Sequence, residues 1–125
     1  MIELELLKDE YSIYKFSPDF DLIDYAKEEA FFSLTKTKDE LSAVAKENTL
    51  SGFIKEENGW KILKINGILD FSLTGILSKI SSVLADENIS IFVISTFNTD
   101  YIMIKNENIN KAVNALRKSG YSIIV

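Results

Sequence analysis

The stretch WKILKINGILDFSLTGILSKISSVLADENISIFVISTFNTDYIMI, residues 60–104, decides the fold. Its first six residues largely alternate between apolar and polar side chains, which is typical of a strand with one buried face. We expect Asn88 to end the following helix in a left-handed conformation. Residues 90–97 are apolar on both faces and rich in β-branched and aromatic side chains, so they predict a central strand. The helix before Asn88 is predicted by apolar residues at spacings of three, four and seven, namely Leu73, Ile76, Leu77, Ile80, Val83 and Leu84.

The end of the chain completes a repeating order of strands and helices. Residues 98–100 predict a short turn, and residues 101–104 a strand that pairs back as a hairpin. A second amphipathic helix ends at Gly120, and residues 121–125 form a last strand. The order β-α-β-β-α-β over residues 60–125 predicts two helices on one face of a four-stranded antiparallel sheet, the ferredoxin-like arrangement. The second helix is predicted from the spacing of Ile109, Ala112, Val113 and Leu116.

The first half of the chain predicts a shortened version of the same arrangement. Thr37 and Glu40 match a capping box, which predicts that a helix follows with Leu41, Val44 and Ala45 on its apolar face. Each half has only about 60 residues, a size at which a separate core is marginal. The remaining elements expected here are strands at residues 2–7, 11–16, 31–34 and 52–56, a short helix at residues 21–27 and a turn at residues 57–59.

The sequence therefore predicts an α+β protein of two ferredoxin-like subdomains that pack together. The N-terminal subdomain is expected at residues 1–59 and is the abbreviated one. The C-terminal subdomain is expected at residues 60–125.

The amino-acid composition excludes several classes of chemistry. The 125 residues include no histidine and no cysteine, while 46% are hydrophobic and 11% aromatic. The apolar content is ample for a folded core and argues against disorder. Without imidazole or thiol groups the chain has no Cys/His zinc site, no disulfide and no Ser-His or Cys-His catalytic pair. We therefore expect no metal site and no enzyme. A histidine-free enzyme using Asp, Glu or Lys stays the weakest alternative, because no residue stands out as an activated acid, base or nucleophile.

The charge and hydropathy patterns predict the localisation of the protein and the classes of partner that it lacks. It carries 14 basic and 19 acidic side chains, a net charge of −5, and a nucleic-acid partner is disfavoured because such partners require clustered Lys and Arg. The first residues lack the basic start and apolar run of a secretory signal. Apolar runs are far shorter than the roughly 20 residues that span a bilayer. We expect a cytoplasmic protein without membrane or nucleic-acid partners.

Residues 67–75 are the first candidate binding segment, because they leave a strand and enter a helix. The start of a helix exposes backbone N–H groups and a partial positive charge, which suit a carboxylate or phosphate. Gly75 would let a ligand approach the first turn closely. Ordinary helix capping by Asp70, Ser72 or Thr74 is the alternative reading. The segment matches neither a Walker loop nor a dinucleotide fingerprint, so we expect no phosphate-bearing cofactor.

Ser95 and Thr96 form a second candidate at the end of the predicted central strand, with Asp100 beyond the turn. Asp100 would pair with a ligand ammonium group. A simple Asx-type turn made by Asn98 and Asp100 is again the alternative reading. The two segments together, with N–H donors for a carboxylate and a carboxylate for an amine, would complement a free amino acid.

In combination, residues 68–77 (ILDFSLTGIL), residues 90–104 and residues 31–45 resemble the ACT-domain proteins. More narrowly, they resemble the small tandem-ACT group that includes the CASTOR nutrient sensors and the regulatory ACT pair of aspartate kinases. This resemblance implies two βαββαβ units that bind amino acids at the interface between ACT units, without catalysis of their own. The ligand-contacting positions that it implies are Asp70, Phe71, Ser72, Leu73, Thr74, Gly75, Ile76, Ile94, Ser95, Thr96 and Asp100.

The function expected from the sequence is thus a stand-alone regulatory module that senses a free amino acid or a similar small zwitterion. The resemblance further implies a homodimer formed by ACT–ACT packing. The alternative is a protein-interaction or scaffold domain that keeps the fold and has lost the ligand.

Overall fold

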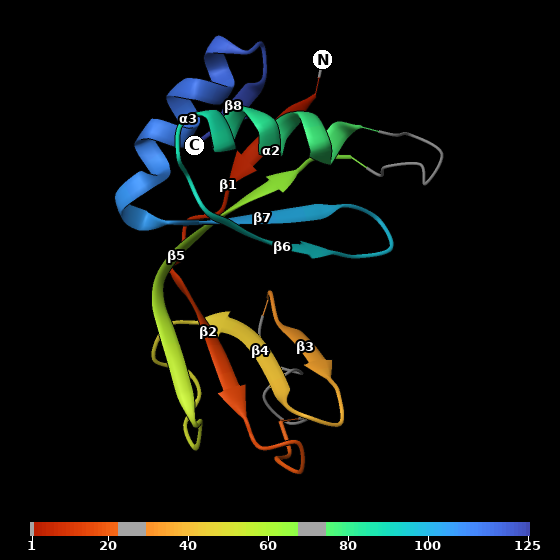
Figure 1. Ribbon diagram of the computed structural model, residues 1–125. Coiled ribbons are helices and arrows are strands. Elements are labelled where there is room, and N and C mark those ends of the chain that lie inside the picture. The colour runs from red at the N-terminus through yellow and green to blue at the C-terminus, as the bar shows by residue number, and fades with distance from the viewer. Residues whose placement is uncertain (1, 23–29, 68–74) are drawn as a thin grey trace. The chain divides into compact units, whose positions relative to one another are not determined.

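The computed structural model describes residues 2–22, 30–67 and 75–125. The chain forms two compact units (Figure 1). One unit combines the segment before Asp9 with the segment from Trp60 onward, and the other runs from Asp9 to Gly59. Strand β5 (Lys55–Ile65) contributes its first five residues to one unit and its remaining residues to the other.

The unit that contains the C-terminal half has the predicted order of elements. After β5 come α2 (Ile76–Asp86), β6 (Ile91–Ser95), β7 (Asp100–Lys105), the short 3-10 helix η1 (Asn106–Asn108), α3 (Ile109–Lys118) and β8 (Ser122–Ile124). The predicted β-α-β-β-α-β order is confirmed, and so is the α+β ferredoxin-like class. Asn88 takes φ 57° directly after α2, as its sequence position predicted.

Among the described residues, the sheet of this unit has five strands, which corrects the predicted four. The additional strand is β1 (Glu3–Leu6), and the order is β8-β1-β5-β7-β6. Leu4 lies opposite Ile65 in an antiparallel pair with β5 and opposite Ile123 in a parallel pair with β8. Its side chain is fully buried in the core of this unit. The first strand therefore belongs with residues 60–125, whereas the sequence division at residue 59 had placed it in the first half.

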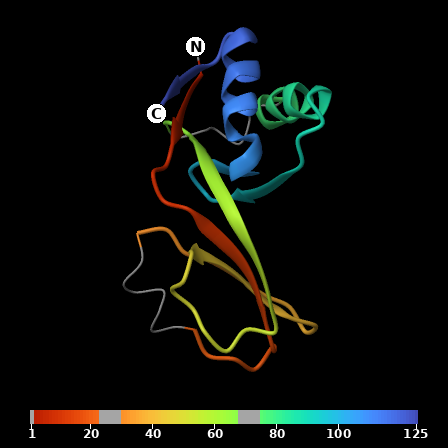
Figure 2. The same ribbon diagram turned by 90° about the vertical axis from the view of Figure 1, so that its left-hand side faces the viewer.

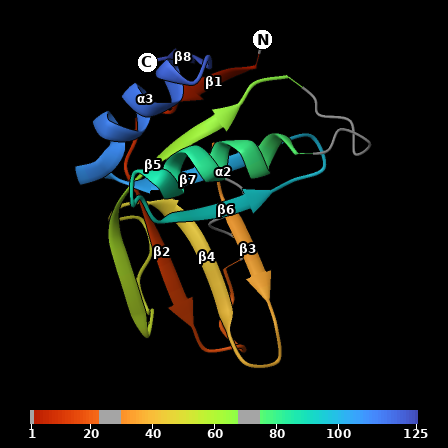
Figure 3. The ribbon, with the colours of Figure 1, turned by 45° about the horizontal axis from the view of Figure 1, so that its top comes forward.

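Both helices of this unit cover the same face of its sheet (Figures 2 and 3). Ile80 and Leu84 of α2 and Leu116 of α3 are fully buried there against Leu63 and Ile65 of β5. Burying a side chain of this size contributes about 1.5–3 kcal/mol to folding. This shared core holds both helices against the sheet.

The strand predicted at residues 90–97 is present as β6, but its predicted central position was wrong, because β6 is an edge strand. Within the described chain β6 pairs with β7 alone. Ile91 and Val93 pack against the helix-covered core, but Phe92 on the other face is 36% exposed. Apolar side chains on both faces of the segment predicted a strand in the middle of the sheet. In the structure the strand lies at the edge of the sheet, and the face that carries Phe92 is partly exposed.

The unit formed by residues 9–59 contains an antiparallel sheet in the order β3-β4-β2. Its strands are β2 (Tyr11–Phe16), β3 (Ser33–Lys36) and β4 (Leu41–Lys46). The helix predicted at residues 41–45 is wrong, because these residues form β4. The hydroxyl oxygen of Thr37 accepts hydrogen bonds from the backbone N–H groups of Asp39 and Glu40, each at 3.1 Å. The apparent capping box thus closes a β-hairpin instead of starting a helix.

Three other predicted boundaries in this half also shift. The strand predicted at residues 31–34 is found at 33–36, and the one predicted at 52–56 starts at Lys55. The turn predicted at residues 57–59 is wrong, because β5 continues through it, with Gly59 at φ 83°. Most of the short helix predicted at residues 21–27 lies outside the described residues.

Candidate functional site

The hairpin between β6 and β7 is closed by two threonines. The backbone N–H of Thr96 donates to the carbonyl oxygen of Thr99 at 2.9 Å, and the Thr96 hydroxyl donates to the same oxygen at 3.0 Å. The turn residues are therefore Phe97 and Asn98, one position earlier than predicted. Asp100 already belongs to β7, directly opposite Ser95. The Asx-type turn at residues 98–100 is thus replaced by a threonine-closed hairpin.

A buried hydrogen bond ties this hairpin to the end of β5. The hydroxyl of Thr99, a residue only 4% exposed, donates to the carbonyl oxygen of Ile65 at 2.6 Å. On the other side of β5, the backbone N–H and the side-chain amide of Asn66 donate to the backbone and the carboxylate of Glu3, both at 2.9 Å. The C-terminal end of β5 is therefore hydrogen-bonded both to the β6–β7 hairpin and to β1. Sequence reasoning missed Thr99 and Asn66, because neither residue type signals a tertiary hydrogen bond.

Helix α2 begins at a glycine without a capping side chain. Gly75 is the N-cap residue and has φ 83°, a conformation that suits glycine. Its carbonyl oxygen accepts the N–H of Lys79 at 2.9 Å. A Cβ atom added at Gly75 would have no atom of the described residues within 4 Å, and the first turn holds no acidic residue. The start of α2 therefore presents backbone N–H groups without a nearby carboxylate from its own first turn, the arrangement that suits an anionic group.

The side chains of Ser95 and Asp100 lie on the face of the sheet that the helices cover. Strand residues alternate between faces, and the buried Ile102 and Ile104 share the face of Asp100. Figures 1 and 3 place the turn between β6 and β7, the end of β5 and the start of α2 at the same end of this unit. The Asp100 carboxylate has no hydrogen bond or ion pair with any residue in the described ranges.

The other predicted site residues divide into three groups. Ile76 is half-buried and packs against the core below α2. Ile94 and Thr96 are placed by strand alternation on the sheet face opposite Ser95 and Asp100. Asp70, Phe71, Ser72, Leu73 and Thr74 lie outside the described residues.

Two general features bear on the kind of site. The described ranges contain no group of three or more Asp, Glu, His or Cys side chains able to hold a metal ion. Nor does any helix within those ranges have the length and apolar character needed to cross a membrane.

With this geometry in place, the comparison with known families identifies the class of protein. The model of the ACT domain matches residues 55–118, so the chain belongs to the ACT domain family. A separate model, described as the N-terminal domain of another family, matches residues 9–52. The resemblance to ACT-domain proteins inferred from residues 68–77, 90–104 and 31–45 is confirmed.

Solved structures extend the likeness over nearly the whole chain. A structural-genomics protein from Agobacterium tumefaciens is 31% identical with a TM-score of 0.88, over 98% of this chain and 92% of that one. A Vibrio cholerae protein described as of unknown function and possibly a transport protein is 20% identical with a TM-score of 0.72, over 94% and 88%. The ligand-free regulatory subunit of aspartate kinase from Thermus thermophilus is 14% identical with a TM-score of 0.66, over 94% and 96%. The latter two likenesses establish the fold alone.

Proposed function

We propose that this protein is a regulatory module that binds a free amino acid or a similar small zwitterion, without catalysis of its own. Membership of the ACT domain family and the fold shared with an aspartate kinase regulatory subunit support this function. The observation that carries it is the juxtaposition of Asp100 and Ser95 on the helix-covered face with the open start of α2 at the same end of one unit.

In the proposed binding mode, Asp100 and Ser95 bind the positive end of the ligand and the start of α2 binds its negative end. The ligand ammonium group pairs with the Asp100 carboxylate through a charge-assisted hydrogen bond, and Ser95 adds a hydroxyl. The ligand carboxylate faces the N–H groups at the start of α2, where Gly75 leaves room. The positions proposed to contact or shape the site are Asp70–Ile76, Ser95 and Asp100, whereas Ile94 and Thr96, which the sequence also suggested, lie on the other face of the sheet.

A thermal-shift screen of the twenty common amino acids at millimolar concentration tests the proposal. A ligand that binds the folded state alone stabilises it by RT ln(1 + [L]/Kd), about 2.7 kcal/mol at a hundredfold excess over Kd. We expect at least one amino acid to raise the melting temperature and Asp100→Asn to abolish the rise. Glu107→Gln removes a charge from an exposed residue elsewhere in the same unit and should leave the rise intact.

A flat response to all twenty amino acids would contradict ligand binding and favour the interaction or scaffold domain. An equal rise in melting temperature in the Asp100→Asn variant would show that the ligand does not bind at Asp100. Gly75→Val provides a second test, because the valine side chain would fill the open space beside the start of α2.

The homodimer belongs to the same proposal, and we place its contact at the edge of β6. No charged residue occurs between Ser90 and Thr99, so two copies of this strand could approach without repulsion. An apolar, uncharged edge strand is a template for pairing with another strand. Two identical β6 edges can pair antiparallel about a two-fold axis, which is the common symmetry of homodimers. We also place the protein in the cytoplasm, in keeping with the absence of cysteine from its sequence.

Sedimentation velocity measures the proposed dimer directly. Ile94→Lys puts a charge on β6 and should shift the protein from dimer to monomer. Leu34→Lys is the matched control, because Leu34 lies on strand β3 of the other unit and is 42% exposed. A monomeric wild-type protein, or a dimer that survives Ile94→Lys, would refute the β6 contact.

A further inference from the structure

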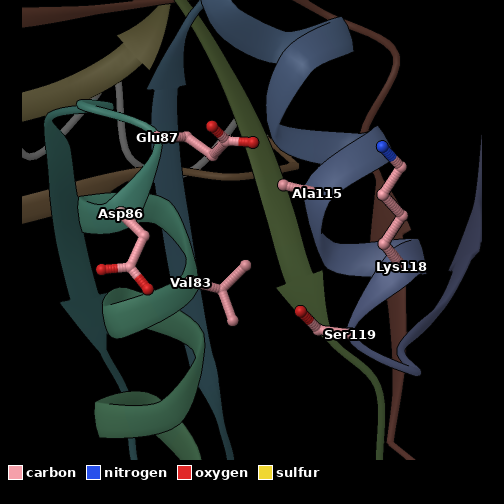
Figure 4. A pocket seen from close by; sticks show the side chains of 6 residues that line it. All are labelled: Val83, Asp86, Glu87, Ala115, Lys118 and Ser119. Carbon is pink, nitrogen blue, oxygen red and sulfur yellow. The ribbon is translucent and has the colours of Figure 1, made fainter.

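A groove of about 340 Å³ lies where α2 and α3 both end (Figure 4). Helix α2 has 11 residues, and at about 1.5 Å per residue its two ends lie roughly 16 Å apart. The groove is therefore separate from the site proposed at the start of α2. Six residues line it, namely Val83, Asp86, Glu87, Ala115, Lys118 and Ser119.

Apolar and polar side chains occupy different parts of the groove. Figure 4 shows Val83 and Ala115 facing each other between the helices, with the Glu87 carboxylate and the Ser119 hydroxyl also directed into this space. Asp86 and Lys118 border the groove on opposite sides. None of the three charged side chains has a hydrogen bond or an ion pair with the residues that the structure describes.

The electrostatics at the end of α2 favour a bound cation. The last turn of a helix carries a partial negative charge, which basic side chains stabilise and acidic ones do not. Helix α3 follows this rule with Arg117 and Lys118 in its last turn. Helix α2 has no basic residue there and instead ends with Asp86 and Glu87. Asp86, Glu87 and the end of α2 make one side of the groove negative, which a cation with N–H donors would neutralise, whereas Lys118 makes the α3 side positive.

We propose that this groove is a second binding site, for a small molecule with a primary ammonium group on a short aliphatic stem and a carboxylate at its far end. The ammonium donates to the Glu87 carboxylate, and the stem lies on Val83 and Ala115, toward Ser119. The far carboxylate accepts from Lys118. The volume is within the range of small-molecule sites. Because its charged groups are exposed to solvent, each ion pair contributes little, and we expect an affinity on the order of millimolar.

Three four-carbon compounds test the assignment: γ-aminobutyrate, butylamine and butyrate. In amide NMR titrations of the full chain, γ-aminobutyrate should shift resonances of residues 83–87 and 115–119. Butylamine should shift the same resonances more weakly, and butyrate should not shift them. Glu87→Gln should weaken both amines by up to about fivefold, as expected for loss of one exposed ion pair. Lys118→Gln should weaken γ-aminobutyrate alone.

Matched control variants remove charges of the same type away from the groove. Glu107→Gln changes an exposed side chain of the same unit, and Lys36→Gln changes one on strand β3 of the other unit; both should leave all three titrations unchanged. The proposal is overturned if γ-aminobutyrate shifts no resonance in these two segments, or if Glu87→Gln and Lys118→Gln bind it like the wild type. Shifts confined to residues 95–100 would refute the second site while leaving the amino-acid site proposed above intact. Shifts in the groove that persist in Asp100→Asn would support it independently of that site.

Discussion

Two glycines with the same backbone conformation offer a sharp test of packing in the unit of residues 9–59. Gly52 and Gly59 both have φ +83°. A Cβ atom at Gly52 would lie 2.6 and 2.7 Å from two ring atoms of Phe20, whereas one at Gly59 would have no atom of the described residues within 4 Å. Replacing each glycine by alanine therefore applies the same backbone strain but adds a steric conflict only at position 52.

The expected magnitudes follow from these contacts. An alanine in the left-handed region costs about 1–2 kcal/mol, and the stiffer unfolded chain returns about 0.4–1 kcal/mol. Gly59→Ala should thus lower the free energy of unfolding by about 1 kcal/mol, and it retains the N–H that donates to Glu47 at 2.6 Å. Gly52→Ala must also displace Phe20 from Phe16, whose ring centroid is 4.6 Å away. Loss of this aromatic contact adds about 0.5–1.5 kcal/mol.

Urea unfolding followed by circular dichroism measures both variants in the same cooperative unit. We expect Gly52→Ala to be less stable than Gly59→Ala by about 1 kcal/mol. In a Phe20→Ala background the two substitutions should cost the same, because the conflicting ring is gone. Equal losses in the otherwise wild-type chain would refute the argument that Phe20 requires a glycine at position 52.

Three further predictions concern single side chains. Thr99→Val should lower the free energy of unfolding by about 1–3 kcal/mol, because it leaves the carbonyl of Ile65 without its buried donor, while Thr96→Val at an exposed position should cost less than about 1 kcal/mol in the same urea assay. Burial raises the pKa of Tyr14 above its ordinary value of 10.0, so the unfolded chain loses this proton first and stability should fall as pH rises through and above about 10. A Tyr14→Phe variant with the same alkaline loss would contradict this. Trp60→Phe removes an indole N–H that is buried without an acceptor among the described residues. The free energy of unfolding should therefore fall by much less than the about 3–5 kcal/mol of a core Trp→Ala change. A decrease of that full size in urea unfolding would argue that the indole N–H does have an acceptor.

The elements of the C-terminal half could be predicted because their hydrophobic periods are unambiguous. Helices α2 and α3 repeat apolar residues with helical spacing over three turns, and the buried residues Ile80, Leu84, Ala112 and Leu116 are among those that the spacing predicted. Asn88 ends α2 with φ 57° because asparagine tolerates the left-handed region.

Strand β4 shows where periodicity fails. Leu41, Val44 and Ala45 have helical spacing, and Thr37 with Glu40 matches a capping box. The same residues are buried on both faces of a strand that lies between β2 and β3. A largely apolar segment of only six residues cannot distinguish a short helix from a strand buried on both faces. Tertiary pairing, and not local preference, decided between them.

The candidate site was only partly accessible from the sequence. Asp100 and Gly75 were selected because a carboxylate near a turn and a glycine at a helix start have recognisable chemistry. The pairing of Ser95 with Asp100, and the opposite orientation of Ile94 and Thr96, depend on the register of the hairpin. That register is set by the threonine-closed turn, which lies one residue earlier than the local sequence indicated.

The sequence by itself determined the order of elements in residues 60–125, the absence of imidazole and thiol chemistry, and the family. These properties depend on residue types and on spacings along a continuous segment. Only the tertiary structure decided that β1 lies between β5 and β8, that β6 is an edge strand, and that Thr99 fastens the hairpin to β5. Each of these joins residues distant in the sequence, and the energy that selects such a partner comes from shared burial and hydrogen bonding that no local pattern contains.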